Sequence, residues 1–262
     1  MGERLRDKVV LVTGAGSGMG RAIAAACASE GAHAVAVDVN SLAVSETVEQ
    51  ITKQDGSAIS AIADVSRREQ VREAIDRGVD AFGRIDVIFN NAGFNKPMHL
   101  LDVTEENWRS IMDVNAMGTL IGIQEAAKRM IQQGTGGKII NTSSIAGRQG
   151  FPSFAPYCAS KFAVIALTQA AARGLAEHNI TCNAFAPGVV GTPLWTQLDQ
   201  DLMEIGDSTR PGQAMEEFAS TILRGRVAAP EDICGTALYL ASADSDYLTG
   251  QVIMIDGGMV LV

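Results

Sequence analysis

Paired cysteines and clustered metal ligands are both missing from this chain of 262 residues. Its four cysteines are scattered without a CxxC pair, which argues against a disulfide framework or a zinc site and favours reduced, buried thiols. Reduced thiols are typical of a cytoplasmic protein, and we expect that location. The three histidines, His33, His99 and His178, lie far apart in the sequence, so we predict no catalytic metal.

An excess of basic residues and long apolar runs are also missing. The chain has 21 lysines and arginines against 30 aspartates and glutamates, and its net charge of −9 argues against a nucleic-acid partner, which would require clustered cations. No apolar run approaches the roughly 18 residues that are needed to cross a bilayer. The first residues also lack the features of a signal peptide. We therefore predict neither a nucleic acid nor a membrane as partner.

Apolar residues make up 47% of the chain, which is enough for a full hydrophobic core. No break in composition, linker or internal repeat divides the sequence, so we predict a single domain over residues 1–262. Strand-like and helix-like runs alternate along it. The predicted strands span residues 9–14, 34–38, 58–65, 85–93, 138–144, 180–188 and 251–256. The predicted helices span residues 19–30, 41–54, 67–82, 105–132, 154–178 and 230–241, with an irregular stretch up to about 225.

This alternation predicts an α/β fold, a Rossmann-type doubly wound parallel sheet of about seven strands with helices on both faces. In such a sheet, ligands bind beyond the carboxyl ends of the strands. The first predicted strand ends in "TGAGSGMG", a glycine-rich turn into a helix that suits a pyrophosphate at the helix N-terminus. Taken alone, this run also fits a simple tight turn.

An acidic residue, Asp38, ends the second predicted strand, eighteen positions after Gly20. A carboxylate at that place accepts hydrogen bonds from the adenosine ribose hydroxyls and repels a 2′-phosphate, which favours NAD over NADP. The loop "AGSG" holds no lysine or arginine that would offset this repulsion. The alternative is that Asp38 is an exposed turn residue at the end of a strand.

Tyr157 and Lys161 are four residues apart in "YCASK", within a predicted helix. Residues at this spacing share one helix face, so the phenol and the ammonium are placed to act on one small molecule. The stretch by itself favours an ordinary amphipathic surface helix. The remaining motifs decide between these interpretations.

Eight motifs occur in order along the chain: "TGAGSGMG", "ADV", "NNAG", "DVNAMG", "NTSSIAG", "YCASK", "NAFAPGVVGTP" and "YLTGQVIMIDGG". With them the sequence resembles a short-chain dehydrogenase/reductase over essentially its whole length. The resemblance implies that Tyr157 is the proton donor and acceptor at the substrate oxygen. It also implies that Lys161 favours the phenolate and binds the nicotinamide ribose, and that Ser144 hydrogen-bonds the substrate oxygen. Asn115 matches the fourth catalytic residue, whose amide holds a water molecule next to the lysine.

The same resemblance implies a set of contacts with NAD. Asp64 and Val65 would flank the adenine, and Thr192 would lie near the nicotinamide carboxamide. Ser143 is the weaker candidate for the catalytic serine, because it points the other way on an alternating strand. The implied cofactor-binding residues are Gly14, Ser17, Gly18, Met19, Gly20, Asp38, Asp64, Val65, Asn91, Ala92, Gly93, Tyr157, Lys161, Pro187, Gly188, Val190 and Thr192.

Within the family, the chain looks closest to bacterial acetoin reductases and butanediol dehydrogenases, with sorbitol-type polyol dehydrogenases near by. Those relatives typically have a glutamine directly after the catalytic serine, where this chain has Ile145, and Phe151 marks a further apolar pocket position. The substrate lid is predicted at about residues 190–226, with Trp195 against the substrate.

We therefore predict an NAD(H)-dependent oxidoreductase that interconverts a small secondary alcohol, diol or polyol and the corresponding ketone. The alternatives are a 3-oxoacyl-thioester reductase of the same fold and a non-catalytic dinucleotide-sensing regulatory protein. The family resemblance and the apolar C-terminal "GGMVLV" suggest a homotetramer in which chain ends pack between subunits.

Overall fold

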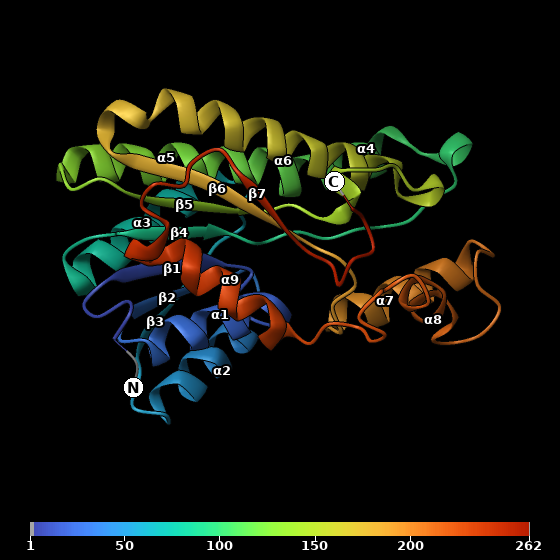
Figure 1. The fold of residues 1–262 in the computed structure, drawn as a ribbon, viewed down its shortest axis with the longest axis horizontal. Helices are drawn as coiled ribbons and strands as arrows, with labels where there is room; N and C mark the ends of the chain where they lie inside the picture. Colours follow the sequence, from blue (N-terminus) through green and yellow to red (C-terminus); the bar gives the residue numbers. More distant parts are fainter. Residues whose placement is uncertain (1–2, 262) are drawn as a thin grey trace.

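Seven parallel strands run through the centre of the molecule in a computed structural model that describes residues 3–261 (Figure 1). The strands are β1 Val9–Thr13, β2 His33–Asp38, β3 Ser57–Ile62, β4 Val87–Asn90, β5 Gly137–Thr142, β6 Ile180–Pro187 and β7 Val252–Ile255. They lie in the order β3-β2-β1-β4-β5-β6-β7, and the pairing is parallel throughout. The predicted doubly wound sheet of about seven strands in a single domain is confirmed.

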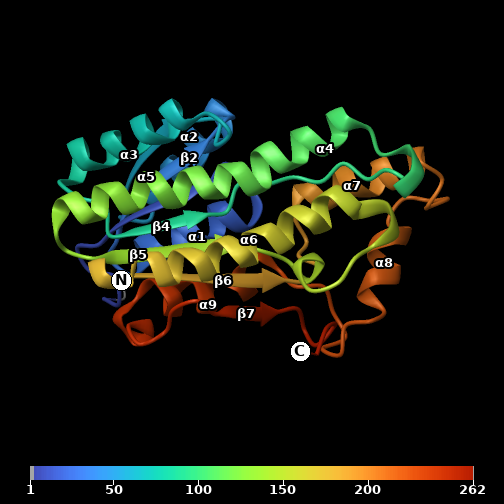
Figure 2. The ribbon, with the colours of Figure 1, turned by 90° about the horizontal axis from the view of Figure 1, so that it is seen from above.

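Helices cover both faces of the sheet. One face carries α1 Gly18–Ser29, α2 Ser41–Thr52 and α9 Pro230–Ala241, and the other carries α3 Arg68–Phe82, α4 Glu105–Met112, α5 Gly118–Gln133 and α6 Ala155–Gly174 (Figure 2). Two further helices, α7 Pro193–Glu204 and α8 Gln213–Ala219, stand beyond the carboxyl ends of the strands (Figure 1). All seven strands run in the same direction, so their carboxyl ends lie at one edge of the sheet. The loops that follow the strands therefore gather at that edge.

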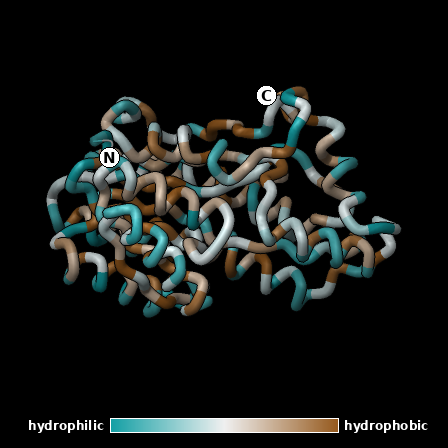
Figure 3. Tube along the Cα trace, turned by 90° about the horizontal axis from the view of Figure 1, so that it is seen from below, coloured by the Kyte–Doolittle hydropathy of each residue, from teal (hydrophilic) through white to brown (hydrophobic). Residues whose placement is uncertain are grey.

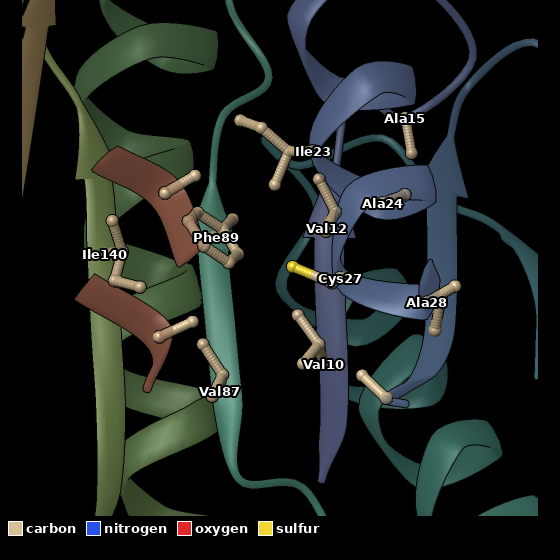
Figure 4. Close-up of a cluster of buried hydrophobic side chains, with 14 of the residues drawn as sticks. Val10, Val12, Ala15, Ile23, Ala24, Cys27, Ala28, Val87, Phe89 and Ile140 are labelled. Atoms are coloured by element: carbon tan, nitrogen blue, oxygen red, sulfur yellow. The ribbon is translucent and has the colours of Figure 1, made fainter. Parts of the chain in front are cut away.

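The central strands are apolar because both of their faces are covered. Hydrophobic segments run through the middle of the molecule, and hydrophilic segments lie on the outer turns (Figure 3). Val10 and Val12 of β1 lie beside Phe89 of β4, and Ile23 and Ala24 of α1 pack on the same side (Figure 4). The buried face of α1 includes Gly20, Ala24 and Ala28, and these small residues let the helix approach the sheet closely. The glycine turn that precedes α1 therefore lies against the strand ends.

Two parts of the chain differ from the predicted elements. The predicted irregular stretch before residue 225 is wrong, because it contains α7 and α8. These helices are stabilised by tertiary contacts, in which Leu198 and Leu202 pack against Phe154 from the main body. The predicted helix 105–132 is interrupted by a π-helical turn, Asp113–Met117, between α4 and α5.

The four cysteines are free thiols. Cys27, Cys158 and Cys182 are buried as predicted, whereas Cys234 is half-buried. Burial raises the pKa of Cys182 to about 12, so this thiol stays protonated and behaves as a small apolar side chain. Among the helices of residues 3–261, none is long and apolar enough to span a membrane.

Candidate active site

A cleft of about 420 Å³ opens at the carboxyl ends of the strands, beside β1, where the order of the strands reverses. We call it the cofactor cleft. The predicted residues on its wall are Gly14, Ser17, Gly18, Met19, Gly20, Asp38, Asp64, Val65, Asn91, Ala92, Gly93 and Thr192. This position is the one at which open α/β sheets bind dinucleotides.

Glycines of the first turn bring the backbone close to this cleft. Gly14 has a φ of 67°, which L side chains rarely adopt, and a Cβ there would lie 2.9 Å from the Cα of Ala92. A Cβ on Gly16 would lie 2.8 Å from Oδ2 of Asp38. The turn therefore has to be free of side chains, and it leads straight into the N-terminus of α1, where unpaired N–H groups favour an anion. These features fit the pyrophosphate of a dinucleotide.

Asp38 ends β2 at the far side of the turn. Its Oδ2 accepts a hydrogen bond from the N–H of Gly16 at 2.8 Å, and its Oδ1 accepts one from the N–H of Asn40 at 2.9 Å. The carboxylate is thereby held on the cleft wall, with lone pairs left for ribose hydroxyls. Arg21, in α1 after the glycine turn, donates to the carbonyl oxygens of Gly16 and Ala43 and pairs with Glu46 at 3.2 Å. Arg21 therefore forms no ion pair with Asp38.

A smaller recess of about 80 Å³ adjoins the cofactor cleft and shares Met19, Asn91, Gly93 and Thr192 with it. We call it the catalytic recess. The other predicted residues on its wall are Ser144, Tyr157, Lys161, Pro187, Gly188, Val190 and Trp195. The structure thus brings together residues from helices α1, α6 and α7 and from the chain segments that follow β4, β5 and β6. Asn115 lies outside both walls.

Tyr157 and Lys161 lie one turn apart on α6, and the Lys161 Nζ is 5.5 Å from the centroid of the Tyr157 ring. Lys161 is 4% exposed, and its ammonium donates to the carbonyl oxygen of Thr142 at 2.9 Å. One buried hydrogen bond satisfies only part of an ammonium, which has three donors. The remaining donors are available to hydroxyls of a ligand in the recess.

Burial shifts both titrating groups toward their neutral forms. It raises the pKa of Tyr157 to about 12, although a hydrogen bond with Ser144 acts in the opposite direction. It lowers the pKa of Lys161 to about 8. Lost hydration is the largest influence on the Tyr157 hydroxyl, and the expectation that Lys161 favours the phenolate stays a prediction. At neutral pH the recess holds a protonated phenol and a charged lysine.

Ser144 and Ser143 follow β5 and point in different directions. The Ser143 hydroxyl donates to the backbone carbonyl of Lys161 at 3.0 Å, so it holds α6 against the strand. The Ser144 hydroxyl accepts from the N–H of Ala146 at 3.1 Å and lines the recess beside Tyr157. The two hydroxyls therefore have different partners, although both residues belong to the wall of the recess.

Asn115 lies in the π-helical turn and is fully buried. Its Nδ2 donates to the Phe94 carbonyl oxygen at 2.9 Å and to the Ser160 hydroxyl at 3.1 Å, and its Oδ1 accepts from the Phe94 N–H at 3.0 Å. These contacts fix the loop after β4 against α6. In this arrangement the amide supports the backbone around the recess, and both Nδ2 hydrogens are already used by protein acceptors.

A third cavity of about 70 Å³ continues from the recess under α7 and α8. We call it the substrate cavity. Trp195 lines it, as predicted, and so do Ile145 and Phe151. Ser144 and Tyr157 belong to the walls of both the recess and this cavity, so their hydroxyls lie where the two meet. A small molecule in the substrate cavity is therefore within reach of the hydroxyls and faces the cofactor side.

Comparison with known proteins assigns the chain to a family. Residues 14–260 match the family model described as Enoyl-(Acyl carrier protein) reductase. A Staphylococcus epidermidis protein named diacetyl reductase, (S)-acetoin forming, is 39% identical over 254 residues, which are 97% of this chain and 99% of that protein. The L-2,3-butanediol dehydrogenase of Corynebacterium glutamicum is 41% identical over 256 residues, with 97% and 99% covered. The crystal structure of levodione reductase matches with a TM-score of 0.92 and 34% identity, covering 97% of this chain and 98% of that one.

The chain belongs to the short-chain dehydrogenase/reductase family. The predicted nearness to acetoin reductases and butanediol dehydrogenases is confirmed by the names of these relatives. The predictions of an oxidoreductase and of a nicotinamide dinucleotide as cofactor are confirmed as well.

Several residues around the site of this dehydrogenase/reductase were not predicted from the sequence. Thr142 accepts from Lys161 through its backbone, and Thr13 Oγ1 accepts from the N–H groups of Asn91 and Ala92 at 3.0 and 3.1 Å. Other missed residues line the substrate cavity: Asn95, Ala146, Phe154, Val189, Leu198 and Phe218. The first four of these lie close to recognised motifs, and Leu198 and Phe218 lie in the predicted lid, but such a position does not say where a side chain points.

The metal prediction concerns the same site. Within residues 3–261 the structure contains no group of three or more histidine, cysteine, aspartate or glutamate side chains that is placed to hold a metal ion.

Proposed function

We propose that this dehydrogenase/reductase interconverts a small secondary alcohol, diol or polyol and the corresponding ketone with NAD(H). The observation that carries the proposal is the pair of hydroxyls, Ser144 and Tyr157, at the junction of a small apolar cavity and a dinucleotide-sized cleft. The relatives named diacetyl reductase and L-2,3-butanediol dehydrogenase act in the same size class. A cavity of about 70 Å³ favours substrates of a few carbon atoms.

In this proposal Tyr157 exchanges a proton with the reacting oxygen, and Ser144 donates a hydrogen bond to it. Bound NAD(H) supplies the hydride acceptor or donor and, when oxidised, a positive charge. Tyr157 is protonated at neutral pH, which suits proton donation to a ketone oxygen. Lys161 holds ribose hydroxyls with its free donors and keeps a positive charge near the phenol. Asn115 keeps the loop after β4 in place.

We propose NAD rather than NADP as the cofactor of this chain. The support is the carboxylate of Asp38, which two backbone N–H groups hold on the wall of the cofactor cleft. Within residues 3–261, the charged side chains on that wall are those of Asp38 and Asp64, both negative. A 2′-phosphate would meet repulsion there, whereas ribose hydroxyls would find acceptors.

The description of the matching family model names a different substrate, an acyl group on a carrier protein. A thioester carrier requires cations at the entrance for its phosphate groups. Near the entrance, Lys96 pairs with Asp201 at 2.6 Å and Arg226 pairs with Asp232 at 2.6 Å, and Arg210 pairs with Glu216. Because these cations are already neutralised by acidic partners, we favour the small alcohol or ketone over the thioester.

We further propose that residues 190–226, with α7 and α8, form a substrate lid. The segment covers the substrate cavity with Trp195, Leu198 and Phe218. It is tied to the main body by the ion pair of Lys96 with Asp201 and by a hydrogen bond of 2.9 Å between His99 and Asp207. These two polar contacts act beside the apolar packing of Leu198 and Leu202 on Phe154, so opening the lid has to break both kinds of contact.

We also propose that the protein is cytoplasmic and forms a homotetramer. Large apolar side chains are exposed on one helix layer, at Trp108 of α4, Ile131 of α5 and Phe162 of α6. Leu261 near the C-terminus is exposed as well, and the last residue of "GGMVLV" lies outside the described residues. Exposed apolar side chains on this helix layer support an interface between copies of the chain.

The direct test is an assay of the purified protein with NADH and a panel of acetoin, diacetyl, small ketones and oxidised polyols, followed by absorbance. We expect reduction of at least one small ketone and the reverse oxidation with NAD. Binding of NADH without turnover on the whole panel would instead support the dinucleotide-sensing alternative.

A further inference from the structure

Asn95 carries a buried amide oxygen without a partner. The residue follows β4 in the loop that leads to α4 and is 7% exposed. Its Oδ1 has no hydrogen-bond partner among residues 3–261. Buried polar atoms in native proteins are nearly always hydrogen-bonded, and an exception in a cavity wall indicates a partner that comes from outside the protein.

The position of Asn95 shows which other side chains a ligand bound to it would contact. Asn95 lines the substrate cavity together with Ser144 and Tyr157, the two hydroxyls assigned to the reacting oxygen. The rest of the wall is mainly apolar, with Ile145 and Phe151 among its side chains. Since the cavity has a volume of only about 70 Å³, a molecule held by Ser144 and Tyr157 also lies beside the other groups on the wall.

The backbone on each side of Asn95 is held in place. Phe94 exchanges two hydrogen bonds with the Asn115 amide, at 2.9 and 3.0 Å. The carbonyl oxygen of Lys96 accepts from Nδ2 of Asn107 at 3.0 Å, and the Lys96 ammonium pairs with Asp201. Both neighbours of Asn95 are therefore anchored, and a fixed loop holds Asn95 at the wall of the cavity. Such pre-organisation lowers the entropic cost of binding a ligand.

We propose that Asn95 hydrogen-bonds a second oxygen of the substrate, on the carbon next to the reacting carbon. The Oδ1 atom accepts a hydrogen bond from a hydroxyl on that carbon. The Nδ2 group of the same amide donates a hydrogen bond to a ketone oxygen on that carbon. This inference rests on the proposed function and narrows its substrate class to 2-hydroxyketones, 1,2-diketones and vicinal diols. Ser144 and Tyr157 remain with the reacting oxygen, and Asn95 selects the neighbouring one.

The test compares substrates that differ only in the second oxygen. Acetoin and butanone share a four-carbon chain, as do 2,3-butanediol and 2-butanol. We would measure kcat/KM for all four with the wild-type protein and with Asn95→Leu, which keeps a similar volume and removes both hydrogen-bonding groups. We expect Asn95→Leu to lose about 10- to 100-fold on acetoin and 2,3-butanediol and to stay within about threefold on butanone and 2-butanol.

The smaller variant Asn95→Ala serves if Asn95→Leu does not fold, and it should show the same selective loss. Binding of NADH, followed by fluorescence, reports that each variant keeps its cofactor cleft. An equal loss on acetoin and butanone would overturn the inference and leave Asn95 with a packing role. A wild-type protein that binds NADH but turns over none of the four compounds would overturn the proposed function, and the inference with it.

Discussion

At the scale of the residue, the hydroxyl of Tyr157 is the group on which the proposed chemistry depends most. Tyr157→Phe removes one oxygen atom and keeps the ring in its place on α6. We expect turnover to fall by at least about 10² to 10⁴, the range typical of general acid-base catalysis, while NADH binding stays nearly unchanged. Steady-state kinetics together with a fluorescence titration of NADH would check both parts.

The matched control for Tyr157→Phe is Ser143→Ala. Ser143 also lies on the wall of the catalytic recess, but its hydroxyl is bonded to the backbone of Lys161. This control should lower thermal stability modestly and keep most of the activity. Substantial turnover by folded Tyr157→Phe would show that the proton takes another route.

The pKa values at the recess predict how rate depends on pH. The pKa of Tyr157 is raised to about 12, so its hydroxyl stays protonated from pH 6 to pH 9. Ketone reduction takes this proton and should keep a nearly constant kcat over that range. Alcohol oxidation needs the phenolate, whose fraction rises tenfold per pH unit below the pKa.

Oxidation should therefore accelerate by about tenfold per unit up to about pH 8. Above that value the rise should become shallower, because Lys161, with a pKa of about 8, loses the charge that stabilises the phenolate. The measurement is kcat in both directions at saturating substrate between pH 6 and pH 9. An oxidation rate that is flat across this range would contradict the assignment of the base.

Asp38 decides a second property at this scale, the choice of cofactor. Asp38→Ala removes the ribose acceptor and the repulsion of a 2′-phosphate, so the ratio of kcat/KM for NAD over NADP should fall by about 10- to 100-fold. Asp64→Ala is the matched control, because Asp64 is the other carboxylate of the cofactor cleft. Asp64→Ala should change kcat/KM by the same factor for NAD and for NADP. Equal use of NAD and NADP by the wild-type protein would refute the role of Asp38.

At the scale of the element, α8 separates two cavities. Phe218 on α8 lies 5.6 Å from the ring of Phe151 and 5.5 Å from that of Trp195, measured between centroids. On its far side is a cavity of about 400 Å³, which also has Phe151 and Phe154 on its wall. The aromatic side chains of α8 and the loop before α6 thus form a partition at the end of the substrate cavity.

Phe218→Ala should open this partition and let longer ketones enter. We expect the ratio of kcat/KM for 2-octanone over butanone to rise by about tenfold, since added methylene groups would find apolar contacts. Phe162→Ala, an exposed ring on α6, is the control and should leave the ratio unchanged. The same ratio in Phe218→Ala and wild type would mean that the larger cavity is not connected to the substrate.

At the scale of the whole molecule, the exposed apolar side chains of α4, α5 and α6 require a cover. We expect a particle of four times the chain's mass of 27.5 kDa in light scattering at micromolar concentration. Phe162→Glu places a charge on this face and should shift the population to smaller particles. The control is Glu69→Gln on α3, which replaces one polar side chain by another and should leave the particle size unchanged. A monomeric wild-type mass at that concentration would rule out the tetramer.

The sequence by itself determined the sheet, the glycine turn and the Tyr157–Lys161 pair of this protein. Each depends on local features: strands and helices follow from hydrophobic periodicity, and residues four apart on a helix share a face wherever the helix lies. The same is true of Asp38, because a residue at the end of β2 lies at the ligand edge of any doubly wound sheet.

Only the tertiary structure decided which other side chains meet the substrate and how the acid and base titrate. Asn95 and Phe218 are more than a hundred residues apart in the chain, and α7 and α8 form because the main body supplies their apolar contacts. Burial raises the pKa of Tyr157, and the extent of burial is set by all the surrounding elements together. Hydration and unpaired atoms depend on packing across the fold, which no local pattern encodes.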